Sequence, residues 1–168
     1  MALMLERISI KWIIGAACIL LALLFAVGWY TREDPADKPY LRVMGGGFII
    51  NYRVADMYYG FTAIVQRPLP TGTIVEAKFE NPEGGEPFVV RQRMGGPDMT
   101  RFSMRSPTVH GVKAKQPYEV SLRILDREET QTIWEYKTHF TSQLDGSFVP
   151  EKPLTIGPGY TKNPELDD

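Results

Sequence analysis

One uncharged stretch dominates the hydrophobic pattern at the start of the chain. Residues 12–30, WIIGAACILLALLFAVGWY, contain no charged side chain. At a rise of about 1.5 Å per residue, a helix of this length spans most of the hydrocarbon core of a bilayer, which is about 30 Å thick. The run closes on Trp29 and Tyr30, aromatic residues that favour the membrane–water interface. The pattern predicts a transmembrane signal-anchor helix that lies in the lipid bilayer.

The same run allows a second interpretation, which is a cleaved signal peptide. The segment 26–28 is similar to a cleavage site, and cleavage after Gly28 would release a secreted soluble β-domain. The length of the run favours the anchor, because the apolar region of a signal peptide is usually shorter. Arg7 and Lys11 precede the run, and basic residues in a short N-terminal segment favour the cytoplasmic side. We therefore expect a cytoplasmic N-terminus over 1–11 and an exported C-terminal part.

Beyond a charged linker over 31–39, the pattern changes to apolar residues at every second position. Such alternation is typical of β-strands with one buried face. The alternating segments are 48–54, 61–65, 75–79, 88–90, 102–104, 118–124 and 134–140. Turns rich in proline and glycine predict that strands over 73–80, 86–94 and 99–106 form a meander of paired neighbours. A longer hairpin connection over 125–132 joins the last two strands.

About seven or eight short strands with turns at this spacing predict an all-β fold. The expected architecture is an antiparallel β-sandwich over 40–145, immunoglobulin-like in type. Tyr118 opens a strand after a loop, where such sandwiches place a corner tyrosine. The remaining segment, 146–168, is rich in proline and acidic residues, which predicts an extended tail.

The chain contains three consecutive glycines, Gly45-Gly46-Gly47, and glycine-rich segments also occur in phosphate-binding loops. Such a loop needs the N-terminus of a helix after it and usually a lysine at fixed spacing. Here an alternating strand pattern follows, without a Lys-Ser or Lys-Thr pair. We expect the glycines to form a tight turn or a bulge between an edge strand and its neighbour, and we expect no bound nucleotide.

Charge and composition argue against several classes of partner, metal site and catalytic activity. The formal net charge of −1 and a pI of about 6.2 provide no global field that attracts nucleic acid, so no nucleic-acid partner is expected. Cys18 is the single cysteine, which rules out an intramolecular disulfide and a cysteine-ligated zinc site. The adjacent carboxylates Glu128 and Glu129 fall on a predicted exposed turn, and neither histidine lies near a nucleophile motif. We predict a protein that is not an enzyme and carries no cofactor.

Four arginines occupy outward positions of two segments that are predicted to pair. They are Arg91, Arg93, Arg101 and Arg105. Like charges on paired strands repel, and an anionic partner such as lipid headgroups or an acidic loop would offset that repulsion. We hypothesise that these arginines bind a partner. The alternative is a solvated sheet face that Glu76 and Glu80 neutralise.

A second candidate site combines thioethers with an imidazole, ligands that suit Cu(I). Its residues are Met94, Met99, Met104 and His110, which lie close in sequence. The alternative is that the methionines fill gaps in the core.

The apolar run itself carries a stripe of small residues. Cys18, Ala22 and Ala26 recur at every fourth position, a spacing that permits close helix packing in lipid. The alternative is that this spacing of small residues arises by chance in a run that is rich in alanine.

Together these patterns predict a single-pass protein of the bacterial inner membrane with a periplasmic β-sandwich. The exported part contains neither cysteine nor an N-x-S/T sequence, which suits a periplasm. The expected role is protein–protein interaction as an accessory, assembly or scaffolding subunit of an inner-membrane complex. The alternatives are copper handling and a secreted soluble domain.

Overall fold

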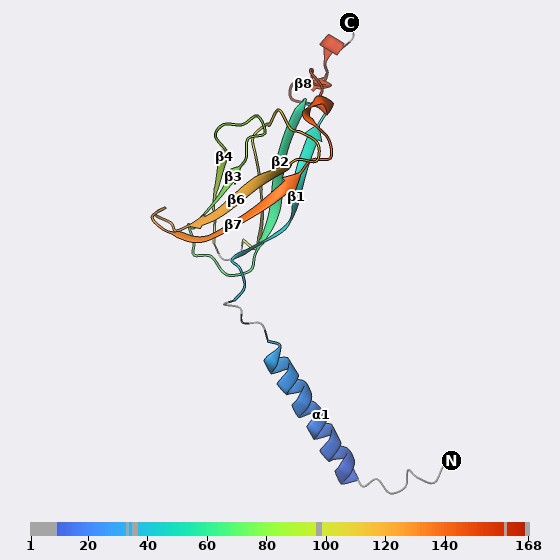
Figure 1. Ribbon diagram of the computed structural model, residues 1–168, viewed down its shortest axis with the longest axis vertical. Coiled ribbons are helices and arrows are strands. Elements are labelled where there is room, and N and C mark those ends of the chain that lie inside the picture. Colours follow the sequence, from blue (N-terminus) through green and yellow to red (C-terminus); the bar gives the residue numbers. More distant parts are fainter. Residues whose placement is uncertain (1–9, 33, 35–36, 97–98, 160, 167–168) are drawn as a thin grey trace, which may run out of the picture. The chain divides into compact units, whose positions relative to one another are not determined.

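The computed structural model describes residues 10–32, 34, 37–96, 99–159 and 161–166. The chain divides into two compact units at the boundary between Lys38 and Pro39. The first unit contains the helix α1 (Ile10–Tyr30), coloured blue in Figure 1. None of its 21 residues is buried. This N-terminal helix is long and apolar enough to cross a membrane.

The second unit is an antiparallel β domain with two larger sheets and one small hairpin. The three-stranded sheet has the order β1-β2-β5, with β1 at Leu41–Asn51, β2 at Asp56–Val65 and β5 at Arg101–Arg105. The four-stranded sheet has the order β4-β3-β6-β7, with β4 at Phe88–Arg93, β3 at Ile74–Phe79, β6 at Pro117–Leu125 and β7 at Thr132–Thr141. The hairpin pairs β8 (Thr155–Ile156) with β9 (Thr161–Lys162), and short 3-10 helices span Gly146–Phe148 and Pro164–Leu166. The predicted mostly antiparallel β domain is confirmed.

Both larger sheets bury alternate side chains in one shared core, and β6 and β7 lie over β1 and β2 in Figure 1. Tyr59 sits in this core: its ring stacks on Phe48, with centroids 4.5 Å apart, and meets Phe79 edge-on at 5.2 Å. Its hydroxyl donates a hydrogen bond of 2.6 Å to the carbonyl of Glu80, which satisfies the polar end of the side chain. Burial, and then the negative charge of Glu80, raise the pKa of Tyr59 above its ordinary value, so the phenol stays protonated.

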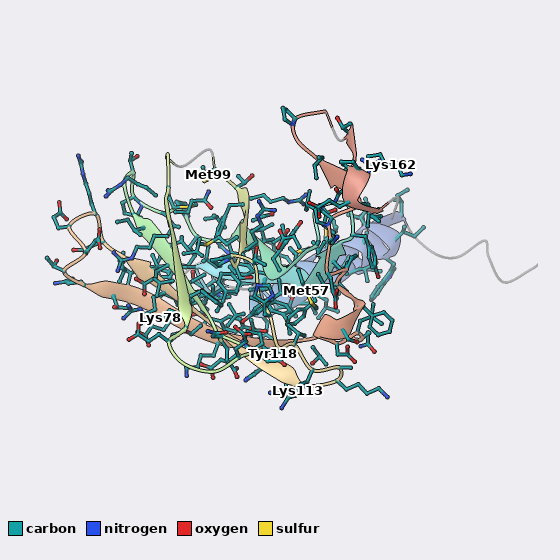
Figure 2. The ribbon with its side chains drawn as sticks, turned by 90° about the horizontal axis from the view of Figure 1, so that it is seen from above. Met57, Lys78, Met99, Lys113, Tyr118 and Lys162 are labelled. Atoms are coloured by element: carbon teal, nitrogen blue, oxygen red, sulfur yellow. The ribbon has the colours of Figure 1, made fainter. Side chains whose placement is uncertain are left out.

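Tyr118, the first side chain buried by β6, ties the preceding loop to the core. The backbone N–H of Lys113 donates a hydrogen bond of 2.8 Å to the Tyr118 hydroxyl, and the two residues lie next to each other in Figure 2. The Tyr118 side chain is only 1% exposed. The bond therefore joins two residues on either side of the turn that leads into β6.

Replacing Tyr118 by phenylalanine is expected to lower the free energy of unfolding by about 1 kcal/mol, because the N–H of Lys113 loses its acceptor. Urea unfolding of the full chain in mild detergent, followed by circular dichroism, measures the change. Tyr136→Phe is the matched control, since Tyr136 is 43% exposed. Equal losses in both variants would show that the Tyr118 hydroxyl contributes nothing specific.

The predicted meander is correct for one pair of strands and wrong for the other. β3 pairs with β4 as expected, in register from Ile74 opposite Arg93 to Phe79 opposite Phe88. β4 and β5 do not pair; β5 joins β2 in the other sheet. Alternation determines which side chains of a strand are buried, as it does for Phe102, but it does not determine which strand lies alongside.

The glycine triplet lies inside a strand, so the predicted tight turn is wrong. β1 begins at Leu41 and runs through the three glycines, whose partners lie on β2. The predicted bulge is present, because the register shifts between Val43 and Gly45 and leaves Met44 as the extra residue. The strand ends at Asn51, earlier than the alternation over 48–54 predicts.

The C-terminal segment also differs from the extended tail that its composition predicts. The N–H of Thr155 donates to the carbonyl of Arg53 over 3.0 Å, which attaches the β8–β9 hairpin to the β1–β2 turn. Asn163 is 3% exposed, and its side-chain amide donates to the carbonyl of Pro153 over 2.9 Å. These hydrogen bonds fold the segment back on itself and onto the β domain.

Candidate functional site

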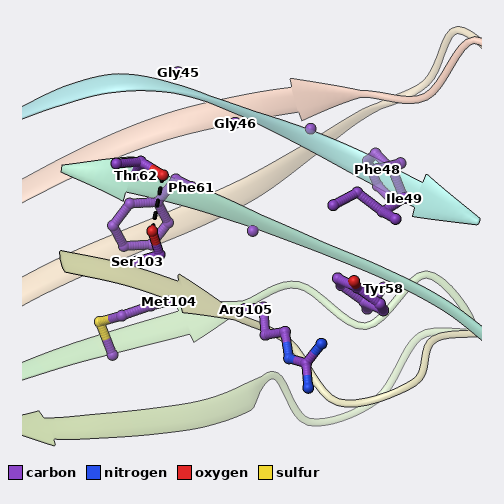
Figure 3. A pocket seen from close by; sticks show the side chains of 12 residues that line it. Gly45, Gly46, Phe48, Ile49, Tyr58, Phe61, Thr62, Ser103, Met104 and Arg105 are labelled. Carbon is purple, nitrogen blue, oxygen red and sulfur yellow. Dashed lines mark hydrogen bonds between the residues drawn. The ribbon is translucent and has the colours of Figure 1, made fainter.

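A furrow with a glycine floor crosses the outward face of the three-stranded sheet (Figure 3). Gly45 and Gly47 of β1 point to this face, opposite Thr62 and Gly60 of β2. Because glycine has no side chain, the backbone itself forms the floor here. The furrow has a volume of about 670 Å³. A flat or protruding group of another molecule could approach the backbone of this sheet closely here.

The walls of the furrow combine hydroxyl, aromatic and aliphatic groups. The hydroxyls of Thr62 and Ser103 lie 2.9 Å apart and share a hydrogen bond across β2 and β5. At the other end, the guanidinium of Arg105 lies over the ring of Tyr58, 4.7 Å from its centroid. Ile49 is 51% exposed beside this pair. The furrow therefore offers a mainly apolar contact surface with a few polar groups at its rim.

Arginines lie on the same face. The β1–β2–β5 register places Arg42, Ile64 and Arg101 side by side across the sheet. Arg105 lies opposite Gly60, four residues along β2 from Ile64 and on the same outward face. Within the described part of the chain, none of these arginines forms an ion pair with a carboxylate. Among the described residues, the face therefore carries three arginine charges without an ion-paired carboxylate around an apolar floor.

The predicted four-arginine cluster is divided between the two sheets, so its premise of paired strands is wrong. Arg101 and Arg105 lie on the outward face of the three-stranded sheet, whereas Arg91 and Arg93 belong to β4. Arg93 donates from Nη1 to the carbonyl of Gly72 over 3.0 Å. Sequence reasoning missed Arg42, because the bulge at Met44 hides its alternation with the glycines that follow.

Arg91 belongs to an ion cluster on the outward face of the four-stranded sheet. Glu76 of the central strand β3 is 1% exposed and lies between Arg91 of β4 and Arg123 of β6. The Nε atoms of these arginines donate to its two carboxylate oxygens over 2.8 and 3.0 Å, and Arg91 also bonds Glu129 over 2.9 Å. Burial raises the pKa of Glu76, but the hydrogen bonds and charges of Arg123 and Arg91 outweigh it and hold the pKa below 4.5. The cluster is satisfied internally, and it holds the strands together.

The residues proposed for copper lie in different environments. Met94 and Met104 are 2% and 4% exposed within the core, and Met99 packs against it. His110 is exposed and lines a loop hollow that no methionine shares. Among the described residues there is also no group of three or more His, Cys, Asp or Glu side chains placed to hold a metal ion. The arrangement matches the alternative, in which the methionines pack the core, and lends copper binding no support.

The small-residue stripe lies within α1. Cys18, Ala22 and Ala26 fall in a helix that carries no buried residue, so nothing in the described part of the chain covers them. Helix packing through this stripe remains a prediction.

No protein-family model matches the chain, and no curated protein matches it. One partly similar solved structure is wild-type OgpA from Akkermansia muciniphila, at 12% identity and a TM-score of 0.37, over 66% of this chain and 30% of that one. Another is a family 76 glycoside hydrolase from a bovine Bacteroides thetaiotaomicron strain, at 16% identity and a TM-score of 0.34, over 60% of this chain and 20% of the hydrolase. The chain spans less than a third of either protein, and likenesses this low assign no activity or substrate.

Proposed function

We propose that the chain is a membrane-anchored accessory or assembly subunit of a bacterial inner-membrane complex, acting through protein–protein contacts. The observation that carries the proposal is α1, which contains an 18-residue stretch of mean hydropathy 2.5 and has no buried residue in the described part of the chain. A helix that is apolar on every side requires a non-aqueous environment. Attached to it is a β domain that forms its own compact unit. Anchor and domain together suit a protein that presents a binding surface at the membrane.

The proposed class of the domain is an immunoglobulin-like sandwich. Its sheets have the orders β1-β2-β5 and β4-β3-β6-β7, so the chain crosses from one sheet to the other between β2 and β3, between β4 and β5, and between β5 and β6. The bond from Lys113 to Tyr118 supports the same class, because it is the contact of a corner tyrosine. Such sandwiches supply exposed sheet faces for recognition, although the architecture by itself defines no partner.

The proposed orientation places the N-terminus in the cytoplasm and the β domain in the periplasm. Lys11 at the start of α1 supports it, since basic residues beside a span are retained on the cytoplasmic side. The furrow with its surrounding arginines supplies the contact surface that an accessory subunit needs. The proposal excludes a nucleotide or nucleic-acid ligand.

Isolation of the tagged full-length protein from membranes in mild detergent tests this function. We expect a protein of full mass that co-purifies with a stoichiometric membrane partner, identified by mass spectrometry. An unrelated single-span protein with the same tag controls for non-specific recovery. A mass loss corresponding to residues 1–28 would establish the secreted alternative. A protein of full mass recovered alone would contradict the accessory role.

A further inference from the structure

The strand geometry does not explain why Gly45 and Gly47 are glycines. Neither has a positive φ, and a Cβ atom added at either position would meet nothing within 4 Å. By contrast, a Cβ atom at Gly60 would lie 2.4 Å from the carbonyl oxygen of Met104, so packing requires that glycine. Glycine inside a strand weakens it and often marks a bulge or a place where another backbone or a ligand approaches closely. Gly45 follows the bulge at Met44, whereas Gly47 lies beyond it in regular register. The bare floor of the furrow therefore points to a contact with another molecule.

Charge on the same face indicates the chemistry of that molecule. Arg42 and Arg101 flank Ile64 in one row, and neighbouring strands are about 4.8 Å apart, so their Cα atoms are separated by about 10 Å. Arg105 lies beside the furrow, two rows away. Asp56 also lies on this face, opposite Asn51 at the far end of the β1–β2 ladder, and no ion pair joins it to these arginines in the described part of the chain. An arginine without a carboxylate partner is a ready site for a bidentate contact with an acidic side chain.

We propose that this face binds a polypeptide segment of a partner protein in which acidic residues flank an aromatic or branched aliphatic residue. The apolar side chain lies on the floor formed by Gly45, Gly47 and Gly60, and the carboxylates reach Arg42, Arg101 or Arg105. An extended peptide suits this spacing, since side chains two residues apart on one face are about 7 Å apart. A lipid places its charge at one end of its apolar part and matches this layout less well. The inference deepens the proposed function and rests on it.

The probe is a phage-displayed library of random 12-residue peptides, selected on the full-length protein in phosphatidylcholine nanodiscs. We expect the selected peptides to share Asp or Glu around Phe, Leu or Ile. Synthetic copies should lose about tenfold or more in affinity for Arg101→Glu, which reverses a rim charge, and for Gly47→Leu, which fills the furrow. Lys113→Glu is the matched control, because it makes the same charge change at an exposed loop residue away from this face, and it should bind as the wild type does. Unchanged urea unfolding of Gly47→Leu shows that the variant is folded.

Several outcomes would overturn the proposal. One is that the selection enriches no peptide, and another is that the enriched peptides share a sequence that contains no acidic residue. The third such outcome is that the synthetic peptides bind Gly47→Leu as tightly as they bind the wild type. Binding to nanodiscs of phosphatidylglycerol but to no peptide would assign the face to anionic lipid instead. The result is separable from the proposed function: a membrane partner that still co-purifies with Arg101→Glu and Gly47→Leu keeps the accessory role and places its contact elsewhere. Wild-type protein that binds peptide but has no membrane partner keeps the surface and removes the role.

Discussion

Replacing Gly46 by alanine is expected to destabilise the β domain by about 3 kcal/mol. A Cβ atom at this position would lie 2.3 Å from the carbonyl oxygen of Gly60 and 2.6 Å from the ring of Phe140 on β7. The carbonyl belongs to the paired strand β2, so it cannot move away without disturbing the ladder. Phe140 is 9% exposed and held in the core. The methyl group therefore forces β1 away from both β2 and the four-stranded sheet.

The neighbouring glycine provides a matched control for this prediction. Gly47→Ala adds the same methyl group on the outward face, where it meets no atom within 4 Å. We expect the free energy of unfolding to stay unchanged or to rise by up to about 1 kcal/mol, because alanine loses less backbone entropy in a strand. Urea unfolding of the full chain in mild detergent measures both variants. Similar stabilities for Gly46→Ala and Gly47→Ala would contradict the close approach of β1 to Phe140.

Replacing Glu76 by glutamine is expected to cost about 2 kcal/mol at neutral pH. The carboxylate is buried and receives charge-assisted hydrogen bonds from Arg91 and Arg123, which glutamine cannot match. The cost stays below that of a fully buried pair, since the two arginine side chains are 52% and 33% exposed and regain water. Glu135→Gln is the control: Glu135 lies opposite Arg123 on β7 but is exposed. Equal losses in the two variants would show that the cluster adds no stability.

The same cluster predicts how stability depends on pH. The pKa of Glu76 is lower in the folded protein than the ordinary value of 4.5. The unfolded chain therefore takes up the proton first as the pH falls. The contribution of Glu76 is complete above pH 4.5 and is lost as the pH falls through its lower folded-state pKa. We expect the stability difference between wild type and Glu76→Gln to shrink over that acidic window when unfolding is measured as a function of pH. A difference that stays constant from neutral pH through this window would exclude the ion cluster as its source.

The candidate site was accessible to sequence reasoning only in part. The glycine triplet is unusual in the sequence alone, and alternation places two arginines of this face, Arg101 and Arg105, at outward positions of their strand. The predicted pairing of their strand, β5, with β4 is wrong, because β4 belongs to the other sheet. The sequence predicts that Arg91 binds a partner, whereas in the structure Arg91 forms ion pairs with Glu76 and Glu129. Whether an arginine is free depends on residues distant in sequence, and these are brought together only by folding.

The sequence by itself determined the apolar N-terminal helix, the alternating strands and most of the side chains that fill the core. These are local properties, since hydrophobic spacing along one segment sets both its conformation and its buried face. Only the tertiary structure decided that β5 pairs with β2, that Gly45 and Gly47 floor an open furrow, and that the C-terminal segment folds back onto the β1–β2 turn. Alternation has the same period whichever strand lies alongside, so it does not specify the neighbour. The choice of neighbour follows from how both sheets close over one core, which is a property of the whole domain.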